Sequence, residues 1–153
     1  VDADEVTYPA HVILRYRIER ALIEGDMKLA DLPVAWNEMM QKLLGITPED
    51  DRNGCMQDIH WPSGAWGYFP TYTLGNLYAA QLYAAALADD PTITEKIAQG
   101  QFTVLLDWMR SHIHIHGSKL LPADLMTQAT GKEPSSDAFI DYLQSKFTKI
   151  YGL

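Results

Sequence analysis

The chain has 153 residues, of which 47% are hydrophobic and 21% are charged, as in a folded protein with one core, and this excludes a disordered or fibrous chain. Its formal net charge of −8 argues against non-specific binding to nucleic acid and against docking on anionic membranes, because both need clustered Lys and Arg. No apolar run is long enough to span a bilayer, and the single cysteine, Cys55, excludes an intrachain disulfide, so we expect a cytoplasmic protein.

The first predicted helix covers residues 8–24, where apolar side chains recur at helical spacing. On its other faces, Arg15 and Glu19, and likewise Arg20 and Glu24, are oppositely charged residues four positions apart. This spacing is typical of ion pairs on the exposed face of a helix. We therefore expect each pair to form on a face of the helix other than its apolar stripe.

Further helices are predicted from periodicity and from Pro, Asp or Gly at their ends. They lie near residues 31–45, 73–88, 91–98, 102–111, 122–129 and 136–151. The sequence shows no convincing strand, internal repeat or linker. It therefore predicts an all-α fold, a bundle of about six to seven helices forming a single domain over residues 1–153.

One long stretch, residues 46–72, has no periodicity and is rich in Pro and Gly. Loops of this length are usually disordered or functional. Four large aromatic residues argue against disorder, because such side chains need to be buried: Trp61, Trp66, Tyr68 and Phe69. We therefore predict one long, ordered and functional loop.

This loop holds the residues best suited to chemistry. Asp58 is placed to orient and polarise the ring of His60, and the phenols of Tyr68 and Tyr72 are donors for a developing oxyanion or a substrate carboxylate. A structural corner is the alternative, in which Asp58 caps the loop, His60 bonds to backbone and the aromatic rings fill the core. The residues alone leave both interpretations open.

A second histidine-rich segment alternates His112, His114 and His116 with isoleucine. On a strand the three imidazoles would share one face, as a zinc site needs. The segment instead follows a helical pattern and ends at Gly117, where histidines favour the carbonyl end of a helix. We favour the helix end over the metal site. No HExxH motif occurs in the chain.

The segment GCMQDIHW, residues 54–61, resembles the GxxQDxHW signature of the thermostable carboxypeptidase (carboxypeptidase Taq) family. The following GYFPTYTLGNLYAAQLY is similar to the next segment of that family. Residues 1–4 resemble the end of the family's RxxAD motif, whose Arg would precede Val1. The resemblance extends over essentially the whole chain.

The resemblance implies an all-helical, dimeric enzyme that removes C-terminal residues from peptides with zinc or another divalent metal such as cobalt. In that family the metal is held by an HExxH helix and a downstream Glu, which lie upstream of the matched region. It therefore implies that the chain is a C-terminal piece, inactive and metal-free by itself. The alternative is a free-standing helical module that binds a peptide or partner without catalysis.

The same resemblance assigns roles to residues of this sequence. It implies that His60 and one tyrosine, Tyr72 in preference to Tyr68, stabilise the tetrahedral intermediate. The residues implied to line the substrate pocket or to support it are Gln57, Asp58, Trp61 and, near the carboxylate-gripping Arg, Asp4. No residue of this chain is expected to bind the metal.

Overall fold

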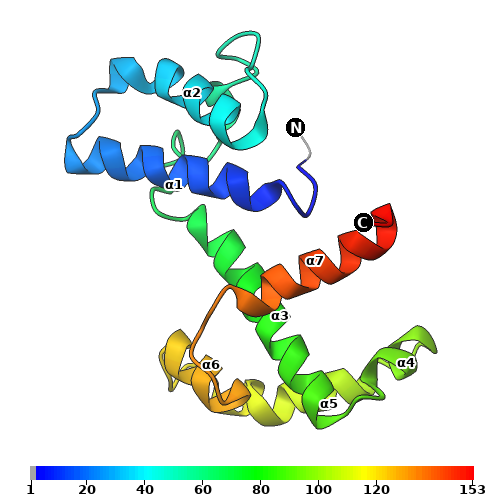
Figure 1. Cartoon of the computed structure of the whole chain (residues 1–153). Coiled ribbons are helices and arrows are strands. Elements are labelled where there is room, and N and C mark those ends of the chain that lie inside the picture. The colour runs from blue at the N-terminus through cyan, green and yellow to red at the C-terminus, as the bar shows by residue number, and fades with distance from the viewer. Residues whose placement is uncertain (1–2) are drawn as a thin grey trace. The chain divides into compact units, whose positions relative to one another are not determined.

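The computed structural model describes residues 3–153, which form helices and loops without a strand (Figure 1). The predicted all-α class is therefore confirmed. Val1 and Asp2, the first residues of the segment that resembles RxxAD, lie outside the described residues. The chain divides after Leu74 into two compact units. That both units belong to one domain stays a prediction.

The first unit is built on two helices that lie side by side, α1 (Tyr8–Glu24) and α2 (Leu32–Leu44) (Figure 1). Each ends at a glycine in the left-handed conformation, Gly25 with φ +82° and Gly45 with φ +71°, which an L side chain adopts only with strain. The unit also contains two short 3-10 helices, η1 (Leu29–Asp31) and η2 (Cys55–Gln57). The bounds of α1 and α2 agree with those predicted from the sequence.

The core of this unit joins the helix pair to the long loop. Leu14 and Ile18 of α1 are fully buried against Trp36 and Met40 of α2, and Cys55 of the loop completes the cluster. Burying each such large apolar side chain contributes about 1.5–3 kcal/mol. The loop is therefore ordered, as predicted, because it shares the core of the helices that carry it.

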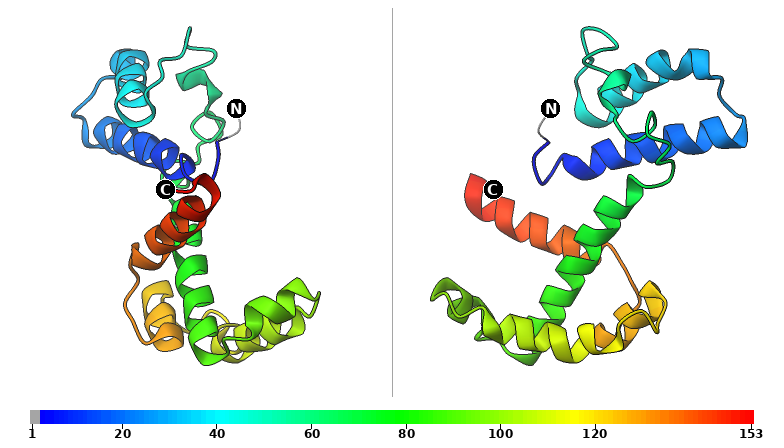
Figure 2. Two further views of the ribbon diagram at one scale, coloured as in Figure 1. Left: turned by 45° about the vertical axis from the view of Figure 1, so that its right-hand side comes forward. Right: turned by 180° about the vertical axis from the view of Figure 1, so that it is seen from behind.

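The second unit contains most of α3 and four later helices (Figure 2). The bounds are Pro70–Asp89 for α3, Ile93–Ala98 for α4, Thr103–His112 for α5, Pro122–Thr130 for α6 and Asp137–Tyr151 for α7. All five lie near their predicted positions. Helix α3 begins at residue 70 instead of 73, because a proline fits the first turn of a helix.

The core of the second unit is a cluster of Ala86, Ile93 and Trp108. The indole N–H of Trp108 donates to Asp89 Oδ2 at 2.7 Å, which ties α5 to the end of α3. A separate cavity of about 530 Å³ is lined by residues of α3, α7 and the turn before α7. At this cavity Gln81 Nε2 donates to Thr130 Oγ1 at the end of α6 at 3.0 Å and to the Glu133 carbonyl in the turn before α7 at 3.1 Å.

The histidine run lies at a helix end, as we favoured. His112 is the last residue of α5, and residues 114–116 form the 3-10 helix η3 (His114–His116). The His112 ring stacks on Trp108 with centroids 4.3 Å apart, and its Nδ1 donates to the Trp108 carbonyl at 2.9 Å. At least one imidazole of the run is therefore engaged in helix packing.

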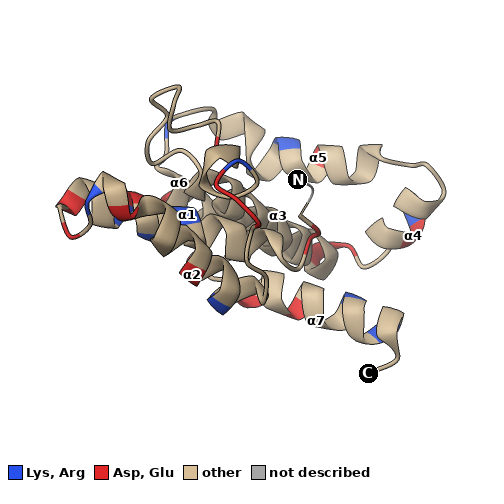
Figure 3. Ribbon diagram, turned by 90° about the horizontal axis from the view of Figure 1, so that it is seen from above, with Lys and Arg blue, Asp and Glu red and all other residues tan. Residues whose placement is uncertain are grey.

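Charged side chains are distributed over many elements (Figure 3). Lys and Arg alternate with Asp and Glu on several helices, and three arginines lie on α1: Arg15, Arg17 and Arg20 (Figure 3). Within residues 3–153, no helix combines the length and the apolar character needed to cross a membrane.

Candidate active site

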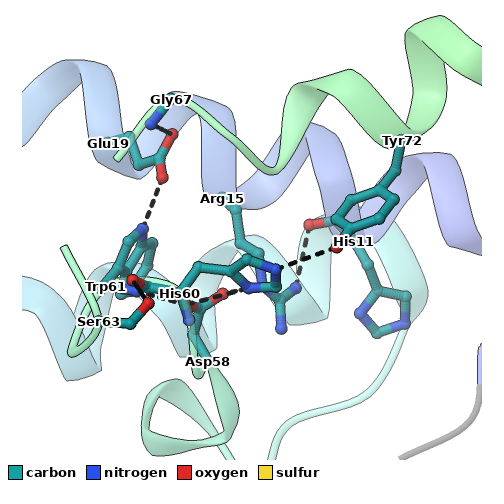
Figure 4. Close-up of polar contacts among 9 residues, drawn as sticks. All are labelled: His11, Arg15, Glu19, Asp58, His60, Trp61, Ser63, Gly67 and Tyr72. Atoms are coloured by element: carbon teal, nitrogen blue, oxygen red, sulfur yellow. Dashed lines mark hydrogen bonds and ion pairs between the residues drawn. The ribbon is translucent and has the colours of Figure 1, made fainter. Parts of the chain in front are cut away.

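Asp58 organises the loop that carries the candidate site (Figure 4). Only 4% of the residue is exposed, and its Oδ1 accepts the backbone N–H of His60 at 2.8 Å and of Trp61 at 3.1 Å. An aspartate that binds the amides two and three residues further on stabilises a tight turn. Asp58 therefore caps the loop, which was one of the two interpretations left open by the sequence.

Arg15 of α1 holds the other oxygen of Asp58. Its Nε donates to Asp58 Oδ2 at 2.7 Å, and only 10% and 1% of the two side chains are exposed. The guanidinium also donates to the His11 carbonyl at 3.1 Å and lies 4.7 Å and 4.5 Å from the ring centroids of Trp36 and Phe69. A buried ion pair with additional hydrogen bonds and aromatic neighbours fixes Asp58 against α1.

Glu19, one helical turn after Arg15, binds the loop at a second place. Its Oε1 accepts the indole N–H of Trp61 at 2.7 Å, and its Oε2 accepts the backbone N–H of Gly67 at 3.3 Å (Figure 4). Only 3% of Glu19 is exposed. The Trp61 ring in turn stacks on Trp66 with centroids 5.6 Å apart.

The prediction that Arg15 and Glu19 pair with each other is wrong. Both residues are buried, and their side chains bind different parts of the loop instead of each other. The second predicted pair is confirmed, since Arg20 Nη2 and Glu24 Oε1 lie 2.8 Å apart on the exposed side of α1. The sequence therefore missed the two residues of α1 that bind the loop.

His60 and Tyr72 meet at the open side of this scaffold. The His60 Nε2 and the Tyr72 hydroxyl are 3.3 Å apart, within hydrogen-bond distance (Figure 4). Tyr68 stacks on the His60 ring with centroids 5.8 Å apart, and Phe69 packs edge-on at 4.9 Å. The structure thus brings together His60 and both predicted tyrosines.

The other ring nitrogen of His60 faces the buried carboxylate. His60 Nδ1 is buried and has no hydrogen-bond partner among the described residues, while Asp58 Oδ1 lies 3.7 Å away. That distance is too long for a hydrogen bond, but the negative charge favours a proton on Nδ1. His60 Nε2 is then the acceptor of a hydrogen bond from the Tyr72 hydroxyl.

The two tyrosines are accessible to a ligand. Tyr68 is 50% exposed and Tyr72 is 39% exposed. Partial burial, followed by the neighbouring Tyr68, raises the pKa of Tyr72 above its usual value. Tyr72 is therefore a neutral phenol at physiological pH, able to donate a hydrogen bond to an anionic oxygen.

Two other predicted site residues make their hydrogen bonds elsewhere. Gln57 is exposed in η2 and donates through Nε2 to the Arg52 carbonyl at 2.5 Å. Asp4 accepts the backbone N–H groups of Val6 and Thr7 before α1, and the bond from Thr7 is the main reason why its pKa is lowered. Roles of Gln57 and Asp4 in a substrate pocket stay predictions.

Candidate metal ligands are not clustered in the described part of the chain. Within residues 3–153, no three His, Cys, Asp or Glu side chains are grouped so that they could hold a metal ion. The carboxylates nearest to His60 in the network are already committed to Arg15, Trp61 and backbone amides. What this site offers is hydrogen-bond donors and acceptors held in fixed positions.

Comparison with known proteins gives a consistent match. Residues 1–147 match the family model described as carboxypeptidase Taq (M32) metallopeptidase. The chain is 46% identical over 152 residues to thermostable carboxypeptidase 1 of Thermus thermophilus and 44% identical over 153 residues to carboxypeptidase 1 of Bacillus subtilis. These alignments cover 99% and 100% of this chain but 30% of each relative.

Solved structures give the same result. The M32 carboxypeptidase of Deinococcus radiodurans is 37% identical, with a TM-score of 0.96 over 99% of this chain and 31% of that one. Pyrococcus furiosus carboxypeptidase is 41% identical, with a TM-score of 0.91 over 95% of this chain and 29% of its own. The chain therefore spans about 30% of the length of the curated relatives it matches.

Proposed function

Because the chain belongs to the carboxypeptidase Taq (M32) metallopeptidase family, we propose that it forms the C-terminal part of a metal-dependent enzyme that removes C-terminal residues from peptides. The names of its relatives and its coverage of about 30% of their length support this proposal. We further propose that zinc or another divalent ion such as cobalt binds outside the described residues, and that this chain alone is inactive. We also propose that the full-length protein is a homodimer and that it lies in the cytoplasm.

The observation that carries the proposal is the contact between His60 and Tyr72. Peptide hydrolysis passes through a tetrahedral intermediate in which the former carbonyl oxygen carries negative charge. The Tyr72 phenol lies 3.3 Å from His60 Nε2 on a scaffold fixed by buried charges, and its single O–H can turn from that nitrogen to donate to such an oxygen or to a substrate carboxylate. Tyr72 supplies the donor, and His60 orients it.

Substitution of the two residues in the full-length protein tests this role. Tyr72→Phe removes one donor and leaves the ring, so we expect kcat to fall by about 10²–10³, the usual effect of removing one oxyanion donor. His60→Ala should lower kcat similarly. Tyr68→Phe should have a smaller effect, because Tyr68 stacks on His60 through its ring.

A matched control is Tyr151→Phe, since Tyr151 is 70% exposed at the end of α7 and outside the site. We expect Tyr151→Phe to keep wild-type kcat and KM. Wild-type kcat for both Tyr72→Phe and His60→Ala would contradict the proposed role of this pair.

The alternative function, a helical module that binds a peptide or partner, is favoured by one observation: Tyr68 and Tyr72 present exposed aromatic surface on an ordered loop. Metal analysis and a peptide-trimming assay on the 153-residue chain separate the proposals. Stoichiometric zinc with trimming would contradict a metal site outside the described residues. Peptide binding by a full-length protein that trims nothing would favour the alternative.

A further inference from the structure

We propose that Glu19 is a positioning residue for the His60–Tyr72 pair, acting as a clamp on the turn between Trp61 and Gly67. Its carboxylate joins the first residue of this turn to the last. His60 directly precedes the turn, and Tyr68 directly follows it. The inference rests on the proposed function, because it assigns Glu19 a part in that reaction.

The chemistry of the two partners requires a carboxylate at this place. The Trp61 indole and the Gly67 backbone both offer an N–H, and neither offers an acceptor at that atom. Only an ionised carboxylate has two oxygens that accept and no hydrogen that would face a donor. A glutamine would satisfy one partner and direct its NH₂ group at the other.

Burying the Glu19 carboxylate costs free energy unless its oxygens accept hydrogen bonds. Only 3% of Glu19 is exposed, and it forms no ion pair with a cation in the described part of the chain. A buried carboxylate that lacks a cation depends on its hydrogen bonds for stability. Both of the bonds formed by Glu19 go to the turn, so the turn and the carboxylate stabilise each other.

The clamp affects the proposed reaction because it fixes the two ends of the turn, which lie next to His60 and Tyr68 in the chain. Trp61 is held by Glu19 at its ring and by Asp58 at its backbone, which fixes the residue next to His60. Gly67 is held where the chain turns towards α3 and Tyr72. Loss of the clamp should widen the range of His60–Tyr72 distances around 3.3 Å.

Kinetics of the full-length protein provide the test. For Glu19→Gln we expect kcat to fall by about 10–100-fold with KM within about threefold, the range seen when groups that orient a site are changed. The matched control is Glu24→Gln, the same substitution on the exposed side of the same helix, which should leave both parameters unchanged. Wild-type kcat for Glu19→Gln beside an impaired Tyr72→Phe would overturn the inference.

A second variant separates positioning from a general loss of folding. In Glu19→Gln combined with Trp61→Phe, the glutamine no longer faces the indole N–H, and its carbonyl remains free to accept from Gly67. We expect the double variant to be no less active than Glu19→Gln alone. If the activity losses of Glu19→Gln and Trp61→Phe instead multiply in the double variant, the clamp is contradicted.

A spectroscopic measurement does not depend on activity. The Trp61 indole N–H should give a downfield, slowly exchanging NMR signal that moves upfield in Glu19→Gln and stays in Glu24→Gln. An unchanged signal would also overturn the inference. Wild-type activity of His60→Ala and Tyr72→Phe would instead count against the proposed function, while the indole signal would still report on the clamp.

Discussion

Replacement of Arg15 by methionine should destabilise the first unit far more than the loss of a surface charge. The side chain of Asp58 is 1% exposed, so Arg15→Met leaves an unpaired carboxylate in the core. Removing one partner of a buried ion pair costs about 3–5 kcal/mol. The lost contacts of the guanidinium with Trp36 and Phe69 add about 0.5–2 kcal/mol. Together the two contributions give about 3.5–7 kcal/mol, and because two backbone bonds to Asp58 remain, we expect the lower part of that range, about 3.5–5 kcal/mol.

Urea unfolding followed by tryptophan fluorescence measures this effect. The chain has four tryptophans, and a Trp108→Phe background leaves three reporters in the first unit: Trp36, Trp61 and Trp66. The midpoint and slope of the transition give the free energy of unfolding. Arg20→Met is the matched control, because the Arg20 and Glu24 side chains are 56% and 48% exposed and such pairs contribute about 0–1 kcal/mol.

The double variant Arg15→Met with Asp58→Asn completes the experiment. It removes both charges, so it should recover a substantial part of the stability that Arg15→Met loses. If Arg15→Met and Arg20→Met differ by less than about 1 kcal/mol, the Arg15–Asp58 pair is no stronger than a surface pair, and the reasoning about burial is refuted.

Two predictions concern the second unit. Hydrogen bonds from Thr92, followed by those from Lys96, lower the pKa of Asp90 from 3.8 to about 2, so the stability it contributes is complete above pH 3.8 and is lost as the pH falls through 2. Asp90→Asn should abolish this part of the acid dependence, and an NMR titration of the carboxyl carbon with a midpoint near 3.8 would contradict it. Gln81→Leu removes the acceptor of the Ser135 backbone N–H, a bond of 3.2 Å, and should destabilise the unit by about 1–3 kcal/mol. Hydrogen exchange at the Ser135 amide measures this, and unchanged protection would count against it.

The helices were predictable because their signals are local. Apolar periodicity and terminal glycines such as Gly25 and Gly45 predicted α1 and α2 with correct bounds. The start of α3 was misplaced by three residues, because Pro70 fits either the end of a loop or the first turn of a helix. Such a choice depends on the residues that pack around it.

The site was predictable only in part. The loop carrying Asp58 and His60 could be recognised from its residue types, but the position of the Asp58 carboxylate, which binds amides and Arg15 instead of the His60 ring, depends on the folded turn. Arg15 and Glu19 were misassigned because the i,i+4 spacing of opposite charges is the same on a buried and an exposed face. One available signal was Val12, an apolar residue three positions before Arg15 and seven before Glu19, since this spacing puts all three on one face of α1, where Val12 is buried.

The single cysteine gives this chain a built-in chemical reporter of loop opening. Cys55 is 9% exposed in the core of the first unit and begins η2 within the loop that carries the site. Burial, followed by the charge of Asp51, raises the pKa of its thiol, so little reactive thiolate is present at neutral pH. A thiol reagent should therefore label Cys55 only during transient local unfolding, at a rate set by the free energy of opening. The labelling rate of each loop variant would then measure how often the candidate site comes apart in an otherwise folded protein.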